Sequence, residues 1–145
     1  MNTAVARFNT GYLDLAFQDP NEVIRLAKRK LGRARVLDEF DTLVGTGFSG
    51  GLIVPMLANE LDKNFVLIRK PRDNSHHSGQ MVGVLGERWL FVDDFTSSGT
   101  TLKRVQRIVK ANATRQYHET EFIGAYFYRG MFGGEPNFVP AKDLL

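Results

Sequence analysis

One stretch of the chain, residues 88–102, restricts the fold more than any other. It begins with the apolar run 89–92, which predicts a strand buried on both faces, as parallel sheets require. Two carboxylates, Asp93 and Asp94, follow directly, and a turn rich in hydroxyl groups comes next. From about Gly99 the apolar residues recur with helical spacing. Because open α/β sheets bind ligands at the carboxyl ends of their strands, this order predicts a ligand site in the turn.

The turn has the chemistry of a site for a phosphorylated sugar. Hydroxyl side chains and the unpaired backbone N–H groups of a helix start bind phosphate. Two carboxylates would repel a phosphate in the same pocket, but they can accept hydrogen bonds from sugar hydroxyls and stabilise a developing positive charge. The alternative is structural, with Asp93 and Asp94 as turn residues and Ser98 as an N-cap. The hydroxyl residues are Thr96, Ser97, Ser98, Thr100 and Thr101.

A second turn, rich in glycine, follows an earlier predicted strand at residues 41–45. Residues 45–50, GTGFSG, match the GxGxxG pattern and precede an apolar helix. Two functions are open: dinucleotide binding, or binding of another anion by backbone N–H groups that glycine leaves accessible. The next strand, residues 64–68, ends in Arg69 and not in the acid that would bind an adenosine ribose. This favours the second function.

The sequence FVDDFTSSGTT, at residues 91–101, resembles the phosphoribosyl pyrophosphate (PRPP) motif of type I phosphoribosyltransferases. Ser97 and Ser98 stand where that family usually has threonine, and Thr96 stands where an aliphatic residue is common. The resemblance covers residues 43–128. It implies an α/β fold with a mostly parallel twisted sheet, flanking helices and a reduced hood. It also implies Mg²⁺-dependent transfer of ribose 5-phosphate between PRPP and a nucleobase, with pyrophosphate as the other product.

The resemblance assigns a role to each part of the site. Asp93 and Asp94 hold the ribose hydroxyls, and the turn of residues 96–101, with Gly99, anchors the 5′-phosphate. Lys70, with Arg69 or Arg72, neutralises the departing pyrophosphate. Mg²⁺ bridges pyrophosphate and ribose oxygens without a direct protein ligand. The remaining implied members are the pyrophosphate-binding residues Thr46, Gly47, Phe48 and Ser49 and the mobile-loop residues Arg72, His76 and His77.

The polar segment 69–80 predicts a long loop, and Arg69-Lys70 resembles the mobile loop of orotate phosphoribosyltransferases. A solvated basic loop is the alternative. Residues 81–85 and 88–92 predict a hairpin. In the helix that follows the acidic pair, the basic residues are expected to point outward; they are Lys103, Arg104, Arg107 and Lys110.

At 145 residues the chain is expected to form one domain. Its core would span about residues 41–128, while 1–40 and 129–145 would supply an arm, a helix starting at Asp19-Pro20 and a short hood. The candidates for contact with the base are Phe48, Phe95 and Arg129, with Tyr128 in a lid over it. Arg129 favours an anionic base, with orotate first.

The composition of the chain excludes some classes of function and limits the expected location and partners. The chain has no cysteine, which excludes disulfides and thiolate chemistry. No apolar run approaches the roughly 20 residues that span a bilayer, and the first residues lack a signal-peptide core, so a cytoplasmic location is expected. The net charge of +3 fits a polyanionic small ligand, and nucleic acid is not an expected partner. A homodimer and a non-catalytic PRPP-sensing regulator of the same fold stay open.

Overall fold

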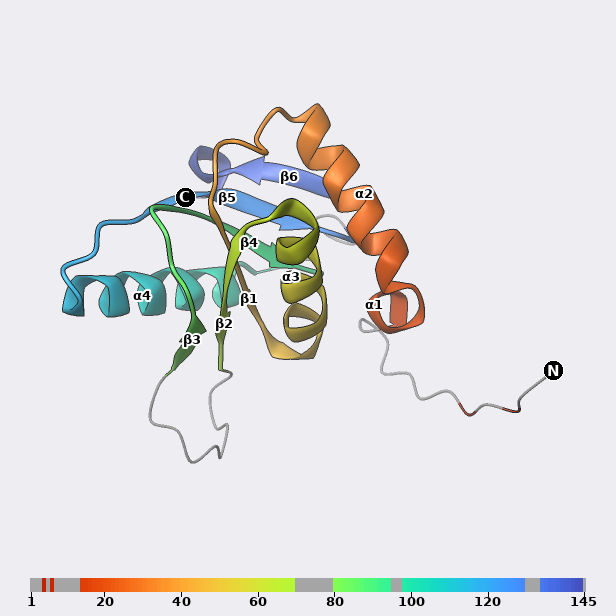
Figure 1. Ribbon diagram of the computed structural model, residues 1–145, viewed down its shortest axis with the longest axis horizontal. Helices are drawn as coiled ribbons and strands as arrows, with labels where there is room; N and C mark the ends of the chain where they lie inside the picture. The colour runs from red at the N-terminus through yellow and green to blue at the C-terminus, as the bar shows by residue number, and fades with distance from the viewer. Residues whose placement is uncertain are drawn as a thin grey trace.

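The computed structural model describes residues 4, 6, 14–69, 80–94, 98–129 and 134–144. Its strands are β1 (Thr42–Thr46), β2 (Asn64–Ile68), β3 (Met81–Gly83), β4 (Arg88–Asp93), β5 (Glu121–Phe127) and β6 (Asn137–Pro140). They form one sheet in the order β3-β2-β1-β4-β5-β6 (Figure 1). The four inner strands run parallel, and the edge strands β3 and β6 run antiparallel to their neighbours. The predicted α/β class with a mostly parallel sheet is confirmed.

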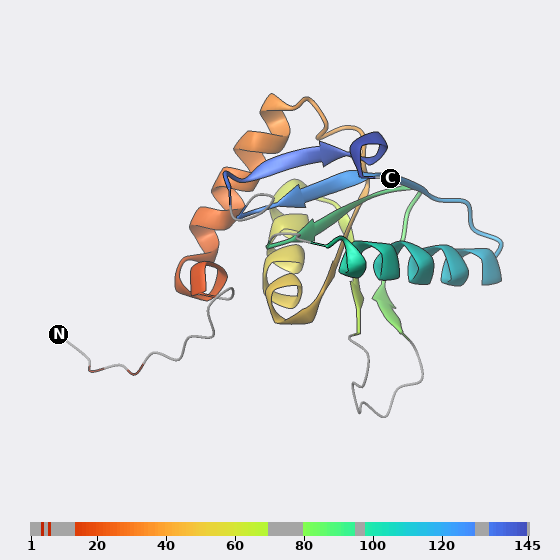
Figure 2. The ribbon, with the colours of Figure 1, turned by 180° about the vertical axis from the view of Figure 1, so that it is seen from behind.

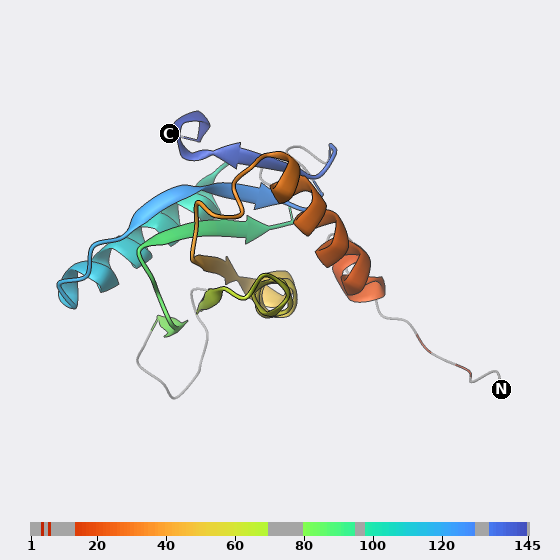
Figure 3. The ribbon, with the colours of Figure 1, turned by 45° about the horizontal axis from the view of Figure 1, so that its top comes forward.

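Helices cover both faces of the sheet (Figure 3). One face carries α1 (Asp14–Gln18), α2 (Pro20–Arg33) and α3 (Gly47–Leu61), and α4 (Thr100–Arg115) crosses the other (Figure 2). Along β4, Leu90 and Val92 belong to the core under α2 and α3, whereas Trp89 and Phe91 belong to the core under α4. The prediction of a strand buried on both faces is therefore confirmed. Within the described ranges, no helix is long and apolar enough to cross a membrane.

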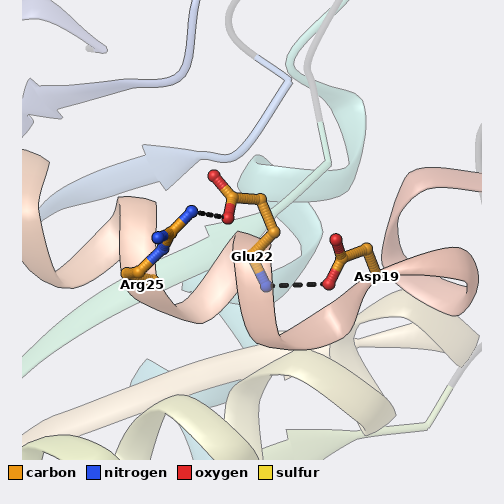
Figure 4. A network of polar contacts seen from close by, with 3 residues as sticks. All are labelled: Asp19, Glu22 and Arg25. Carbon is orange, nitrogen blue, oxygen red and sulfur yellow. Dashed lines mark hydrogen bonds and ion pairs between the residues drawn. The ribbon is translucent and has the colours of Figure 1, made fainter.

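The start of α2 follows from its sequence. Asp19 accepts a hydrogen bond from the Glu22 backbone N–H at 3.2 Å, and the Glu22 carboxylate forms an ion pair with Arg25 (Figure 4). Pro20 occupies the first turn, where its missing N–H costs least. Such a cap stabilises a helix by about 1 kcal/mol. The apolar stripe of the helix packs into the core through Val23, Ile24, Ala27 and Leu31.

The predicted hairpin between residues 81–85 and 88–92 is wrong. β3 pairs with β2, with Met81 opposite Ile68, and β1 lies between β2 and β4. The apolar pattern marks both strands but does not identify their partners. Gly83 adapts β3 to its place at the edge. It has a φ of 129°, and a Cβ there would lie 2.2 Å from the Phe65 carbonyl oxygen.

Two segments without a clear sequence period contain regular elements. The N-terminal arm includes the helical turn α1. Residues 137–140, which the sequence placed in a hood, instead form β6 and pair with β5 from Gly124 to Phe127. β6 is a four-residue edge strand that ends in Pro140, too short for a period to appear.

Asp41 holds the amino ends of β1 and β4 together. Its carboxylate accepts hydrogen bonds from the Thr42 hydroxyl at 2.7 Å and from the backbone N–H groups of Glu87 and Arg88 at 3.0 and 3.2 Å. Burial alone would raise the pKa of this carboxyl, but these hydrogen bonds and the Arg88 charge hold the pKa below its ordinary value. Asp41 is therefore ionised wherever the protein is near neutral pH.

Candidate functional site

The sheet has a topological switch point between β1 and β4. From β1 the chain passes through α3 to β2 on one side, and from β4 it passes through α4 to β5 on the other. Val44 pairs with Phe91, and Thr46 and Asp93 each lie two residues further along these neighbouring strands. Ligands of open α/β sheets bind at this kind of crevice. The structure thus brings both turns singled out in the sequence to one place.

Close packing of glycines sets the position of the turn after β1. A Cβ on Gly50 would lie 3.1 Å from the Gly45 carbonyl carbon, and a Cβ on Gly45 would lie 2.5 Å from the Val54 side chain. Gly47, the first residue of α3, has a φ of 74°. The glycines therefore let the start of α3 lie directly against the carboxyl end of β1.

The N-cap residue of α3 makes no side-chain hydrogen bond to the helix. Thr46 stands at the N-cap position, where its hydroxyl would normally accept a hydrogen bond from the helix backbone. Instead, this hydroxyl donates to the Ile68 carbonyl oxygen at 2.7 Å. The expected pyrophosphate residues Thr46, Gly47, Phe48 and Ser49 thus lie at a helix start that Thr46 does not cap, which suits an anion.

Asp93 and Asp94 lie at the end of β4, both half-buried. The Asp94 backbone N–H donates to the Asp93 carboxylate at 2.9 Å. Their carbonyl oxygens accept hydrogen bonds from the N–H groups of Tyr128 and Arg129, at 3.0 and 2.8 Å. The end of β5 therefore fixes the backbone of the acidic pair, beside the start of α3.

The hydroxyl-rich turn leads into α4 through Gly99, which has a φ of 76°. The Thr100 N–H donates to the Ser98 hydroxyl at 3.3 Å, but the N-cap residue of α4 is Gly99 and not Ser98, and Thr100 and Thr101 are exposed. The predicted members Phe95, Thr96 and Ser97 lie outside the described residues. The described part of the turn supplies hydroxyl groups and a helix N-terminus next to the acidic pair.

Arg104 was expected to point outward from α4, and this prediction is wrong. The residue is half-buried, and its guanidinium donates to the Arg69 carbonyl oxygen at 3.2 Å and to the Thr46 hydroxyl at 3.4 Å. Its position borders the apolar stripe of α4, so its long side chain reaches across the ends of β2 and β1. Of the expected basic loop, Arg69 lies at this edge. Lys70, Arg72, His76 and His77 lie outside the described residues.

Aromatic and basic groups flank the acidic pair. Phe48 is 78% exposed in the first turn of α3 and is free to contact a planar ligand. Arg129 is half-buried beside Asp94.

Tyr128 was considered for a lid, but it is 2% exposed in the core under α3. No described atom is a hydrogen-bond partner of its hydroxyl, although Ser49 lies nearby. Burial raises the pKa of this phenol well above its ordinary value, and the charges of Asp93 and Asp94 act in the same direction.

Other parts of the described structure are weaker candidates for a ligand or metal site. No group of three His, Asp or Glu side chains within the described ranges could hold a metal ion. An open groove of about 660 Å³ lies between α4 and the amino ends of β4 and β5, lined by residues such as Trp89, Lys110 and His118. Its His118 ring already contacts the Gly86 carbonyl oxygen at 2.7 Å. The carboxyl ends of the strands are therefore the stronger candidate.

Comparisons with known proteins show what the chain as a whole is similar to. No family model matches the chain. An orotate phosphoribosyltransferase of Pyrococcus abyssi is 30% identical over 108 residues, which are 72% of this chain and 53% of that protein. The chain thus spans about half the length of the curated relative it matches.

Two solved structures share the fold. Adenine phosphoribosyltransferase of Saccharomyces cerevisiae superposes with a TM-score of 0.58 and 21% identity, over 80% of this chain and 72% of that one. Orotate phosphoribosyltransferase of Aeropyrum pernix superposes with a TM-score of 0.56 and 19% identity, over 75% of this chain and 60% of that one.

Proposed function

Because the chain belongs to the type I phosphoribosyltransferase family, we propose that it transfers ribose 5-phosphate between PRPP and a nucleobase. The observation that supports this most is the placement of Asp93 and Asp94 between the starts of α3 and α4. PRPP carries phosphate groups on both sides of one sugar, and two helix starts flanking two carboxylates match that distribution of charge. The yeast adenine enzyme likewise binds adenine together with an imino-sugar bisphosphate.

In the proposed reaction a nitrogen of the base attacks the ribose carbon that carries pyrophosphate. The new C–N bond forms as the C–O bond breaks, pyrophosphate leaves with the electron pair, and the proton of the base nitrogen passes to water. The ribose develops positive charge on the way, which Asp93 and Asp94 stabilise while they hold its hydroxyls. The start of α3 holds pyrophosphate, and the turn before α4 anchors the 5′-phosphate. Lys70, with Arg69 or Arg72, neutralises the leaving group.

The residues fit a magnesium-dependent reaction. Mg²⁺ keeps several waters and binds substrate phosphate oxygens, so it would need no direct ligand from the chain, and Asp93 and Asp94 would hold the ribose hydroxyls beside it. In this proposal the ion arrives with PRPP and supplies charge neutralisation at pyrophosphate.

For the base we propose orotate first. Arg129 lies beside Asp94 and can pair with a carboxylate on the base, and the curated relative is an orotate enzyme. Phe48 offers an exposed ring for stacking. The test is competitive, with orotate, adenine, hypoxanthine, guanine, xanthine and uracil offered together with Mg-PRPP. A purine nucleotide as the main product would contradict the orotate preference and leave the transferase proposal standing.

The transferase proposal itself is tested with the two acids. Asp93→Asn and Asp94→Asn should each lower turnover at least tenfold, on the order of the contribution of one electrostatic group in an active site. Thermal unfolding should change little, because both side chains lie at a strand end. Wild-type turnover in both variants would contradict the ribose assignment. PRPP binding by calorimetry with no turnover on any base would instead identify a PRPP-sensing regulator.

The assembly and location expected from the sequence stay predictions. Sedimentation analysis, with and without Mg-PRPP, checks the homodimer. The glycine turn, considered for a dinucleotide, is assigned here to pyrophosphate because the family places that ligand at the turn after β1.

A further inference from the structure

The start of α3 is open because its own N-cap residue points elsewhere. Thr46 has one hydroxyl donor and two acceptor lone pairs. The donor goes to the Ile68 carbonyl oxygen at 2.7 Å, and the oxygen accepts from the Arg104 guanidinium at 3.4 Å. In this orientation the hydroxyl does not cap α3. The backbone N–H groups at Phe48 and Ser49, which an N-cap threonine would bind, are left to another acceptor.

Arg104 contacts the same threonine from the opposite face of the sheet. It projects from the second turn of α4 and bonds two groups on different strands, the Thr46 hydroxyl at the end of β1 and the Arg69 carbonyl oxygen after β2. Neither acceptor is charged. Within the described ranges, Arg104 forms no ion pair with a carboxylate.

We propose that Arg104 is a positioning residue for pyrophosphate. The bond to Ile68 holds the Thr46 hydroxyl against β2, and Arg104, by donating to the same oxygen, helps keep the threonine from capping α3. The free N–H groups of α3 then bind the phosphoryl oxygens. This role rests on the proposed phosphoribosyltransferase function. Without Arg104, the Thr46 hydroxyl can turn to the N–H groups of α3 and compete with the ligand for them.

The first experiment measures ligand affinity by calorimetry. Arg104→Gln should weaken binding of pyrophosphate and PRPP about five- to tenfold, the equivalent of one helix cap. The affinity for ribose 5-phosphate, which lacks pyrophosphate, should change less than twofold in the same variant. Arg107→Gln is the matched control, because Arg107 is exposed one turn away on the same helix.

A double-mutant cycle separates competition by Thr46 from loss of charge or of fold. In a Thr46→Val background no hydroxyl is present to cap α3, so Arg104→Gln should weaken pyrophosphate binding less than twofold. The same five- to tenfold loss in both backgrounds would overturn the proposal, and so would unchanged affinity in the single Arg104→Gln variant.

A measurement without ligand keeps this inference separate from the proposed function. Amide hydrogen exchange at Phe48 and Ser49 should slow in Arg104→Gln relative to wild type, because the hydroxyl now caps these groups. Unchanged exchange would overturn the inference, even if the protein is a transferase. If exchange slows but the wild-type protein binds no pyrophosphate, the positioning of Thr46 stands and the proposed function fails.

Discussion

Two neighbouring glycines in the first turn of α3 should respond in opposite directions to the same substitution. A Cβ on Gly50 would lie 3.1 and 3.3 Å from the carbonyl carbon and Cα of Gly45, whereas a Cβ on Gly51 would meet nothing within 4 Å. Neither glycine has a positive φ, so the helix accepts alanine at both positions. The difference between them comes only from the contact with β1.

The magnitudes follow from two terms. Glycine to alanine in a helix stabilises by about 0.5–1 kcal/mol, and Gly51→Ala should show the whole of this gain. At Gly50 the gain is opposed by overpacking of about 1–3 kcal/mol. The neighbouring atoms are backbone of β1, which is paired on both sides and has little freedom to move. Gly50→Ala should therefore destabilise the protein by about 0.5–2 kcal/mol in total.

Urea unfolding measures the effect as a shift in midpoint at constant slope. In thermal unfolding, each kcal/mol corresponds to about 2–4 °C at this size. Because Gly50→Ala moves the start of α3 away from β1, it should also weaken pyrophosphate binding, and Gly51→Ala should not. If Gly50→Ala is as stabilising as Gly51→Ala, the close approach of α3 to β1 is wrong.

Two further predictions concern ionisable groups. Asp41→Asn should lower the free energy of unfolding by about 1–2 kcal/mol at pH 7, because a charged acceptor of three hydrogen bonds is lost. Since the pKa of Asp41 is lowered by folding, its contribution is complete above the unfolded pKa of about 3.9 and disappears as the pH falls through the folded pKa, where the two proteins should unfold alike. Tyr128→Phe should leave the free energy of unfolding unchanged or raise it by about 1 kcal/mol, because it removes a buried hydroxyl without a partner among the described residues. If urea unfolding instead shows that the free energy of unfolding falls by more than about 1 kcal/mol, the hydroxyl makes a hydrogen bond.

The sequence predicts the elements better than it predicts their partners. The strand at 89–92, the acidic pair and the helix after them appear where the apolar period and the turn residues placed them. The same pattern does not say which strand lies beside which. β3 was therefore paired with β4, although the antiparallel edge of the sheet lies on β2. Pairing depends on contacts between segments distant in the chain, and a local period carries no information about them.

The site shows the same limit. The two turns were predicted from residue type alone, and the switch point brings them together. Arg104 was missed because helical spacing places it among the solvent-facing cations, and only the neighbouring strand ends explain its contacts. A basic residue at the border of an apolar stripe, within two turns of a ligand-binding helix start, is the signal that could have identified it.

The two ends of β1 have different roles: the amino end contributes to stability, and the carboxyl end is the proposed site of ligand binding. Asp41 acts just before the amino end and Thr46 at the carboxyl end, five residues apart, which is about 16 Å of strand. That is about twice the screening length at physiological ionic strength, so the Asp41 charge has little influence on an anion beside Thr46. Loss of the Asp41 carboxylate should therefore lower stability and leave pyrophosphate affinity unchanged. Gly50→Ala changes both, because it displaces the helix whose first turn holds the anion. Measuring stability and affinity for both variants thus tests whether the carboxyl end of the sheet, and not the fold as a whole, binds the ligand.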